Sequence, residues 1–539
     1  MDIMSFAYPA LALGASVLLW YLLKEFNIAG GHAALPPGPP RRLVIGNLLD
    51  IPETSLWKTL TNMAQSYGDV LSLKVFSQPI VVLSSLQAAT DLFDKRAAIY
   101  SDRYTSVMMH ELCNAGWIPT FMNYGDRWRN TRKIYHQYFG PHALHNYKSV
   151  QDEKLRSFLR RLRDEPEHFN DHILYVFGAT IMKMMYGIEV QDSRHEEVVT
   201  AEQAMSKFAE AGQPGRWLVD MFSPLKYVPE WFPGAQFKKL ASLCISLSER
   251  TRNNAFNKAK QAYESGHPLP CIVTDILEKL PDTAEGRELE QCARDSLGSA
   301  FAAGSDTTVA YVKWFFLAML MHPEAQKKAQ QELDRVVGPD RLPDVDDRAS
   351  LPYTEAVIKE VLRWQPVAPL AFTHCTAADD EYRGYHIPKG TIVIGNAWSI
   401  LHDTSAYPDP ESFMPERFLN PDGSLNANIR DPQVACFGFG RRTCPGRYLA
   451  MNSLYQVIAS VLHTFNISPS LNDVGRNVIP SEVEGLILYV ILVHDFSLIV
   501  SRTLVIPAVP CIMIAPSNLV QLLRKCLSLR QTTYSAPLC

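Results

Sequence analysis

Apolar side chains recur along most of this chain at the three- and four-residue spacing of amphipathic helices. In residues 354–364 they fall at positions 357, 358, 361, 362 and 364, and Pro366 follows, which predicts a helix with one apolar face. Long helices are also predicted over residues 289–321 and 323–337, the second with proline at its start and glycine after its end. Another apolar, helix-like stretch covers residues 448–462.

Shorter stretches are rich in β-branched residues and are typical of strands. Residues 70–75 and 80–83 are predicted strands set apart by a Gln-Pro pair, and residues 391–396 form a third. The hydrophobic fraction of 47% and the charged fraction of 20% are ordinary for a globular protein with a sizeable core. These patterns predict a fold that is mainly α with small β-sheets.

The net charge and the cysteine spacing argue against several classes of protein. A net charge of −4, from 52 basic and 56 acidic residues, argues against nucleic acid as a partner. Ten cysteines at irregular spacing match neither a disulfide framework nor a zinc pattern. We therefore expect most cysteines to be reduced and structural.

The N-terminal segment has the pattern of a membrane anchor. No residue from 3 to 23 is charged, and at roughly 1.5 Å per residue this run would span about 30 Å, the thickness of a bilayer core. A cleaved signal peptide is the alternative, but such peptides usually start with basic residues and this chain starts Met1-Asp2. Lys24, Arg41 and Arg42 after the span place the remainder in the cytosol. We expect residues 1–26 to be a transmembrane anchor and residues 27–45, with their Leu-Pro-Pro-Gly-Pro-Pro run, a stiff hinge.

A cysteine motif gives the strongest indication of chemistry. Residues 437–446 read Phe-Gly-Phe-Gly-Arg-Arg-Thr-Cys-Pro-Gly, with fixed offsets between Phe437, Gly440, Arg442, Cys444 and Gly446. Backbone N–H groups in such a turn, just before a helix, favour an anionic sulfur, and glycines let the backbone approach a flat cofactor. Cys444 is therefore a candidate thiolate ligand, and Arg442 a candidate partner for a carboxylate.

Two further motifs are each compatible with ordinary structure. Glu360 and Arg363 meet on one helical surface, as many solvated pairs do, and a Pro-Glu-Arg-Phe segment later supplies Arg417. Residues 303–308 read Ala-Gly-Ser-Asp-Thr-Thr inside a long helix, where glycine costs about 1 kcal/mol and threonine can bond to a carbonyl one turn back. A buried helix with a polar spot would carry the same hexapeptide.

Aromatic and basic residues add a fourth group. Trp128 and Arg132 lie four residues apart and project from one helix face. His374 follows an apolar segment and precedes Cys375; a single histidine of this kind is commonly a satisfied structural residue.

Together, and in this order over residues 35–485, these motifs resemble the cytochrome P450 superfamily in its microsomal class. Residues 396–403 and 225–233 are similar to those of fungal O-methylsterigmatocystin oxidoreductase-like monooxygenases. The resemblance implies a cytochrome P450 fold with a single haem domain over residues 46–485. It implies haem b as cofactor, with Cys444 as axial ligand of the iron.

The resemblance also assigns roles to individual residues. The cofactor-binding set that it implies is Trp128, Arg132, Ala303, Gly304, His374, Phe437, Arg442, Cys444 and Gly446. Many relatives have arginine where this chain has Cys375, which puts the propionate contact of His374 in question. Asp306 and Thr307 would deliver protons during oxygen activation, a task suited to a carboxylate beside a hydroxyl. Glu360, Arg363 and Arg417 would form a structural network beneath the haem loop.

The function that the resemblance implies is monooxygenation. One oxygen atom from O2 would enter a small apolar substrate, in fungal secondary metabolism or xenobiotic oxidation. Electrons would come from NADPH through a separate cytochrome P450 reductase, with cytochrome b5 as an optional second donor. The enzyme would be a monomer on the endoplasmic reticulum membrane with a cytosolic catalytic domain, and the aromatic segment 225–233 would dip into the bilayer. The alternatives are an isomerase or dehydratase acting on peroxides and an inactive haem-binding protein.

The C-terminal region departs from the expected pattern. After residue 485 the family pattern calls for a short β-hairpin that lines the substrate pocket, whereas residues 486–509 are an interrupted apolar run. This run is too short and too broken for a second membrane span. We interpret residues 486–539 as atypical, with a retained intron or mispredicted splice junction as the hypothesis, which sequencing of the transcript would test.

Overall fold

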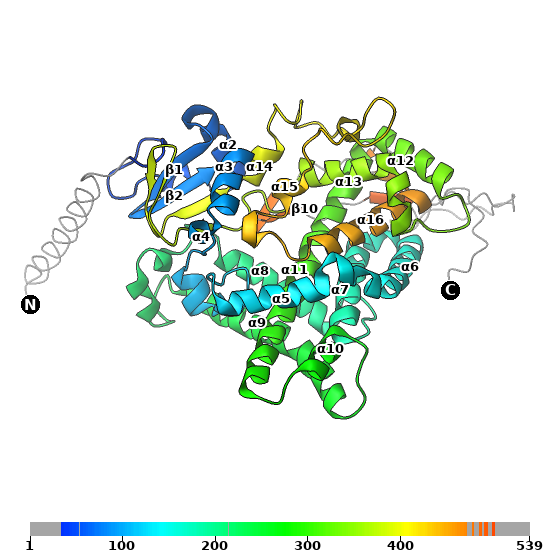
Figure 1. Ribbon diagram of the computed structural model, residues 1–539, viewed down its shortest axis with the longest axis horizontal. Helices are drawn as coiled ribbons and strands as arrows, with labels where there is room; N and C mark the ends of the chain where they lie inside the picture. The colour runs from blue at the N-terminus through cyan, green and yellow to red at the C-terminus, as the bar shows by residue number, and fades with distance from the viewer. Residues whose placement is uncertain are drawn as a thin grey trace, which may run out of the picture.

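The computed structural model describes residues 34–52, 54–213, 215–471, 477–478, 484–487, 490–493 and 498–501. Helices dominate, and the sheet that holds β1 and β2 lies at one side of the helical body (Figure 1). The prediction of a mainly α fold with small β-sheets is confirmed. The anchor predicted over residues 1–26 lies outside the described residues, and so does most of the hinge. Within the described ranges, no helix is long and apolar enough to span a bilayer.

The elements have these bounds. The α-helices are α2 (Leu56–Tyr67), α3 (Leu86–Ala89), α4 (Ala97–Tyr100), α5 (Asp126–Phe139), α6 (Lys148–Asp164), α7 (Phe169–Tyr186), α8 (Glu196–Ala211), α9 (Gln236–Glu264), α10 (Ile272–Lys279), α11 (Ala284–Met321), α12 (Pro323–Val336), α13 (Pro352–Trp364), α14 (Ala397–Leu401), α15 (Gln433–Cys436) and α16 (Arg447–Thr464). The strands are β1 (Val70–Val75), β2 (Gln78–Leu83), β3 (His374–Cys375), β4 (Asp380–Tyr382), β5 (Tyr385–Ile387), β6 (Ile392–Gly395), β7 (Asn466–Leu471), β8 (Asn477–Val478), β9 (Glu484–Ile487), β10 (Val490–Val493) and β11 (Leu498–Ser501).

Short helical segments of one or two turns connect these elements. They are η1 (Leu48–Asp50), η2 (Thr90–Lys95), η3 (Val107–Leu112), η4 (Ala115–Trp117), η5 (Pro141–Tyr147), η6 (Pro166–His168), η7 (Leu218–Asp220), η8 (Ser223–Tyr227), η9 (Val345–Ser350), η10 (Pro415–Phe418) and η11 (Gly440–Arg442).

Helix α11 passes through the centre of the molecule and contacts α5, α7, α8, α9, α13 and α16 (Figure 1). In its C-terminal half, residues 309–321 are apolar apart from Lys313, so neighbouring elements can cover most of their surface. Trp314, Phe315 and Phe316 from this half are buried in the largest apolar cluster, together with residues of α7, α13 and α16. The long helix predicted at 289–321 is therefore the core of the domain and positions whatever its middle turns present.

The main sheet has the strand order β1-β2-β6-β3. Strand β2 pairs antiparallel with β1 and parallel with β6, and His374 of β3 pairs opposite Val393. The predicted break at Gln78-Pro79 is wrong, because both residues belong to β2 and the turn lies at residues 76–77. Pro79 is tolerated because it precedes the first pair with β6, where its missing N–H is not needed.

The C-terminal strands show that one expectation was wrong. The apolar run after residue 485 was expected to replace a β-hairpin, yet the backbones of β9 and β10 pair antiparallel as one, with Ile487 opposite Val490. Strand β10 lies against α11, and β11 pairs with β7. The run is rich in β-branched residues, which are suited to strands. The splice-junction hypothesis for residues 486–539 stays a prediction, and most of that segment lies outside the described residues.

Helix α13 depends on α12 for the capping of its first turn. Its N-cap residue is Leu351, whose side chain cannot accept a hydrogen bond. Glu332 of α12 takes this role: its carboxylate accepts the N–H groups of Tyr353 and Thr354, both at 2.8 Å, and the Thr354 hydroxyl at 2.9 Å. Because Glu332 is buried, these bonds satisfy both the carboxylate and the helix end.

Replacing Glu332 by alanine should lower the free energy of unfolding by about 2–4 kcal/mol, because three donors, two of them buried, lose their acceptor. Denaturant unfolding followed by circular dichroism would measure this change. Glu324→Ala, an exposed substitution in the first turn of the same helix, is the control and should change stability by about 0.5 kcal/mol or less. Equal effects of the two variants would contradict the capping role.

Candidate active site

The segment 437–446 forms a tight loop between α15 and α16. The Cys444 N–H donates to the Phe437 carbonyl oxygen at 2.8 Å, which closes the loop. Gly440 has a φ of +52°, and a Cβ there would lie 2.1 Å from the Phe93 carbonyl oxygen. Only glycine fits this position, because the loop backbone packs directly on the backbone of η2.

Burial and the neighbouring polar groups shift the pKa of Cys444 in opposite directions. Burial raises the pKa of the thiol, whereas the Gly446 N–H and the nearby Arg132 and Arg447 lower it. Gly446 is the N-cap of α16, so the sulfur faces the positive end of that helix. This geometry agrees with the prediction that backbone N–H groups favour the anionic sulfur.

Helix α5 brings Trp128 and Arg132 to the same loop. The Arg132 guanidinium lies 5.5 Å from the Trp128 ring centroid, and its Nη1 donates to the Thr443 carbonyl oxygen at 2.8 Å. Arg442 lies 4.5 Å from the same ring. The structure therefore brings together three of the residues predicted to bind an anionic cofactor edge.

Arg442 is held by backbone oxygens. Its side chain donates to the carbonyls of Ser101 at 2.8 Å, Pro119 at 3.3 Å and Met122 at 2.8 Å. Burial lowers its pKa to about 10, so it remains a cation at neutral pH. In this arrangement Arg442 links the cysteine loop to residues 101–122; its predicted carboxylate contact stays a prediction.

His374 lies buried beside these groups. Its Nδ1 lies 2.6 Å from the Tyr100 carbonyl oxygen and so donates to it, and its ring centroid lies 4.2 Å from that of Phe93. Burial, Arg103 and Arg442 lower the pKa of the imidazole well below its usual range, so the ring is neutral. A neutral ring with its proton on Nδ1 accepts at Nε2, and the predicted role of His374 as a propionate donor stays a prediction.

The middle of α11 is accessible at its smallest residues. Ala303 is exposed although the helix runs through the core, and Gly304, Asp306 and Thr307 are partly exposed. The Thr307 hydroxyl donates to the Ala303 carbonyl oxygen at 3.0 Å, the bond one turn back that the sequence indicated. Accessible surface on one face of an otherwise buried helix leaves room for a flat group beside Ala303.

The carboxyl group of Asp306 lies on this face and has a strongly raised pKa. Partial burial, together with the negative charge of Glu202 on α8, raises its pKa to about 6, and Lys313 opposes the shift. The carboxyl group therefore gains and loses its proton close to neutral pH. Such a group can serve as a proton donor or acceptor under physiological conditions.

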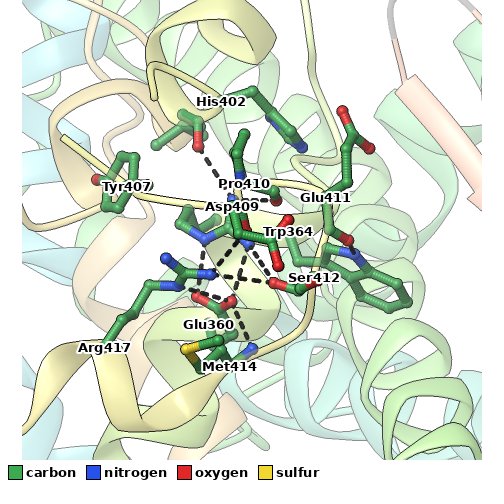
Figure 2. A network of polar contacts seen from close by, with 12 residues as sticks. Glu360, Trp364, His402, Tyr407, Asp409, Pro410, Glu411, Ser412, Met414 and Arg417 are labelled. Carbon is green, nitrogen blue, oxygen red and sulfur yellow. Dashed lines mark hydrogen bonds and ion pairs between the residues drawn. The ribbon is translucent and has the colours of Figure 1, made fainter. Parts of the chain in front are cut away.

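A buried ionic network joins α13 to the segment that contains η10 (Figure 2). The Glu360 carboxylate accepts from Arg363 Nε at 2.7 Å and Nη2 at 2.8 Å, from Arg417 Nε at 3.1 Å and from the Met414 N–H at 2.8 Å. Glu360 and Arg363 are 0% exposed, which excludes a solvated surface pair. The contact predicted among Glu360, Arg363 and Arg417 is present.

The same network fixes the irregular segment that follows β6 and α14. The remaining donors of the two arginines bond to carbonyl oxygens, namely those of Leu401, Pro408, Asp409, Pro410 and Ser412. Arg363 also lies 5.5 Å from the Tyr407 ring, and the Tyr407 hydroxyl donates to the Arg430 carbonyl oxygen just before α15. The network thus reaches the segment that leads into the cysteine loop.

Sequence reasoning missed the support of the loop from η2 and α4. Phe93 contacts Gly440 through its carbonyl and stacks on Phe439 with ring centroids 5.5 Å apart, and Ser101 accepts from Arg442. This segment carries no motif. Only its apolar pattern, which any packed helix shares, was visible in the sequence.

Arg363→Lys should lower the free energy of unfolding by about 3–5 kcal/mol, because a lysine cannot bond to both Glu360 oxygens and to three carbonyls. Thermal or denaturant unfolding would measure the loss. Arg341→Lys removes a bidentate pair with Asp347 at the surface and should cost about 1 kcal/mol or less. A loss at Arg363 no larger than at Arg341 would exclude the anchoring role.

Comparisons with known proteins agree with this geometry. The cytochrome P450 family model matches residues 36–487. The chain is 43% identical to cytochrome P450 monooxygenase COX2 of Coprinopsis cinerea over 443 residues, which cover 82% of this chain and 84% of that protein. It is 41% identical to cytochrome P450 monooxygenase 208 of Postia placenta over 478 residues, or 87% and 91% of the two chains. The matched residues include the cysteine loop, the accessible middle of α11 and the buried ionic network, and the chain belongs to the cytochrome P450 family.

Proposed function

We propose that this cytochrome P450 monooxygenase inserts one oxygen atom from O2 into a small apolar organic molecule, in fungal secondary metabolism or xenobiotic oxidation. The observation that carries the proposal is the pairing of two sites. One is Cys444 in its N–H-lined loop, and the other is the Asp306–Thr307 pair on the open face of α11. The first suits a thiolate ligand and the second suits proton delivery.

The residues present fit a haem. Cys444 would hold the iron, the exposed Ala303 leaves space for a flat ring, and Trp128, Arg132 and Arg442 surround an edge that suits anionic groups. When bound, a thiolate-ligated haem supplies reductive activation of dioxygen. The chain itself supplies the loop that holds the sulfur and the polar groups that face the ring.

Asp306 and Thr307 are proposed to manage protons. With a pKa of about 6, the Asp306 carboxyl group can be reloaded from water on its partly exposed side. The Thr307 hydroxyl directs its own hydrogen to the Ala303 carbonyl, which leaves its oxygen lone pairs free to accept a proton. The pair can therefore pass a proton toward the open face beside Ala303.

The monooxygenase function is favoured over two alternative functions. An isomerase or dehydratase that rearranges peroxides has no need of the Asp306–Thr307 relay, and an inactive haem protein has no need of it either. NADPH-dependent oxygen uptake with a reductase distinguishes the first function from the others. Conversion of a peroxide without reductase would identify an isomerase or dehydratase.

We also propose that the enzyme works at the endoplasmic reticulum membrane. Exposed apolar side chains gather at η7, η8 and the segment that follows: Leu218, Phe222, Tyr227, Trp231 and Phe232, with Trp231 80% exposed. Exposed aromatic groups of this kind favour a bilayer interface. The patch and the predicted anchor at residues 1–26 together support a membrane-bound monomer with its domain in the cytosol.

Electron supply is proposed to come from NADPH through a cytochrome P450 reductase, with cytochrome b5 as an optional donor. Two exposed basic side chains lie at or near the cysteine loop, namely Arg441 and Arg129. Arg129 and Arg441 both lie 5.4 Å from the ring of Tyr124, and although Arg129 also pairs with Asp126, the two arginines give this surface a net positive charge. Such a surface would attract an acidic flavoprotein to the thiolate side.

The experiment that tests the proposed function is a carbon-monoxide difference spectrum of the reduced, membrane-expressed protein. A strongly red-shifted Soret band would establish thiolate ligation by Cys444 and justify substrate screening with reductase. A band at the position of histidine- or thiol-ligated haem, or no band, would contradict the function for the chain with its present C-terminal segment.

Asp306→Asn should lower product formation by about tenfold to hundredfold, because the relay loses its titratable group. The folded-state pKa of Asp306 lies above the ordinary 3.8, so the folded state binds the extra proton and stability falls as pH rises from about 4 to 6. Asparagine removes this cost, and the variant should be at least as stable as the parent at neutral pH. Turnover with a screened substrate and thermal unfolding would measure the two effects.

Glu202→Gln provides the matched control for this titration. Because the Glu202 charge raises the pKa of Asp306, its removal should move the inflection in the pH profile of turnover to lower pH while the maximum rate is retained. An unchanged inflection in Glu202→Gln, or full activity in Asp306→Asn, would exclude Asp306 as the proton donor.

A further inference from the structure

Three side chains of helix α5 make polar contacts with α11. Arg127 Nη2 donates to Asp295 Oδ2 at 2.6 Å, the Thr131 hydroxyl lies 3.5 Å from the Cys292 sulfur, and the Tyr135 hydroxyl donates to a carbonyl of α11 at 2.9 Å. Residues 127, 131 and 135 are each four apart and therefore lie one above the other on the helix. They form three successive polar contacts between the two helices, which lie beside each other at the centre of the molecule (Figure 1).

Asp295 is the only charged acceptor in this row of contacts. It is 0% exposed, and its other oxygen accepts from Arg252 Nε at 2.6 Å and from Gln291 Nε2 at 2.9 Å. One buried carboxylate thus joins α5, α9 and α11. A buried carboxylate is retained at low cost only while its cationic partners stay in place, so its position and that of Arg127 depend on each other.

The cofactor face of α5 lies next to this bonded face. Trp128 and Arg132 each follow one residue after a bonded position, which turns them by about 100° around the helix axis. Arg132 reaches the Thr443 carbonyl and Trp128 lies against Arg442, so both side chains contact the cysteine loop from this fixed orientation. A rotation or shift of α5 would move both at once.

We propose that Asp295 is a positioning residue for the cofactor edge of the site. By holding Arg127, it sets the rotation of α5 and thereby the placement of Trp128 and Arg132. Asp295 itself contacts neither residue of the cofactor face. One test of the proposal, the rate of haem loss, rests on the proposed haem-thiolate function. The other test, hydrogen exchange in α5, rests on the α5–α11 geometry alone.

The two arginines on Asp295 allow a matched test. Arg127 belongs to α5 and is half exposed, so its removal should leave the protein folded, whereas Arg252 belongs to α9. Helix α9 is held against α11 independently of this pair, because a Cβ at Gly298 would lie 2.9 Å from the Arg252 Cα. Arg127→Gln and Arg252→Gln each remove one cation from the same carboxylate, but only the first releases α5.

The experiment measures haem transfer from the ferric full-length protein to excess apomyoglobin, together with hydrogen exchange of peptide 126–139. Arg127→Gln should speed haem loss by about three- to tenfold, as expected for a partly exposed charge-assisted bond, and increase exchange in α5. Arg252→Gln should change the transfer rate by less than about twofold, because α5 stays bonded to Asp295 through Arg127. Asp295→Asn should reproduce the Arg127→Gln effect.

Three outcomes would overturn the proposal. They are equal acceleration by both arginine variants, no acceleration by Arg127→Gln, and unchanged α5 exchange in Arg127→Gln and Asp295→Asn. If the parent protein takes up no haem, the proposed function fails instead, and the exchange measurement still decides whether Asp295 holds α5. Acceleration by Arg252→Gln alone would assign the effect to α9 rather than to the cofactor face.

Discussion

The burial of Glu360 between two arginines is the interaction on which the site most depends. Removing a carboxylate and two guanidinium groups from water is costly unless their bonding capacity is met. Here Glu360 accepts four hydrogen bonds. The remaining N–H groups of the arginines donate to carbonyl oxygens between residues 401 and 412. An irregular segment without a sheet to hold it therefore acquires one fixed path, and that path leads into the cysteine loop.

The same physical device recurs wherever distant segments must meet. Glu332 bonds the first turn of α13 from α12, and Asp295 joins three helices. Arg442 donates to three carbonyls that lie more than three hundred residues earlier in the chain. In each case one buried charged group satisfies several backbone or side-chain partners, so the arrangement tolerates little displacement. Apolar packing brings the helices together, and these groups select their rotation and register.

Burial also sets the chemistry of the two functional groups. It raises the pKa of the Cys444 thiol and of the Asp306 carboxyl group alike, but their neighbours differ. Cys444 has an N–H group and two arginines that favour its anion, whereas Asp306 faces another carboxylate that disfavours its anion. One group is thus prepared to hold a negative charge and the other to hold a proton. The two groups are far apart in sequence, and the fold brings both α11 and the loop to the centre of the molecule.

The sequence by itself determined the family, the helical class, the long central helix and the residues at fixed offsets within one element. Cys444 with Gly446, Glu360 with Arg363, and Asp306 with Thr307 are local patterns, because helix and turn geometry fixes which neighbours meet. The tertiary structure decided the contacts between elements. It placed Gly440 on the Phe93 backbone, Glu202 beside Asp306, Arg442 on three carbonyls and Asp295 beneath α5. Such contacts depend on how helices pack, and packing is a property of the whole chain that no local spacing records.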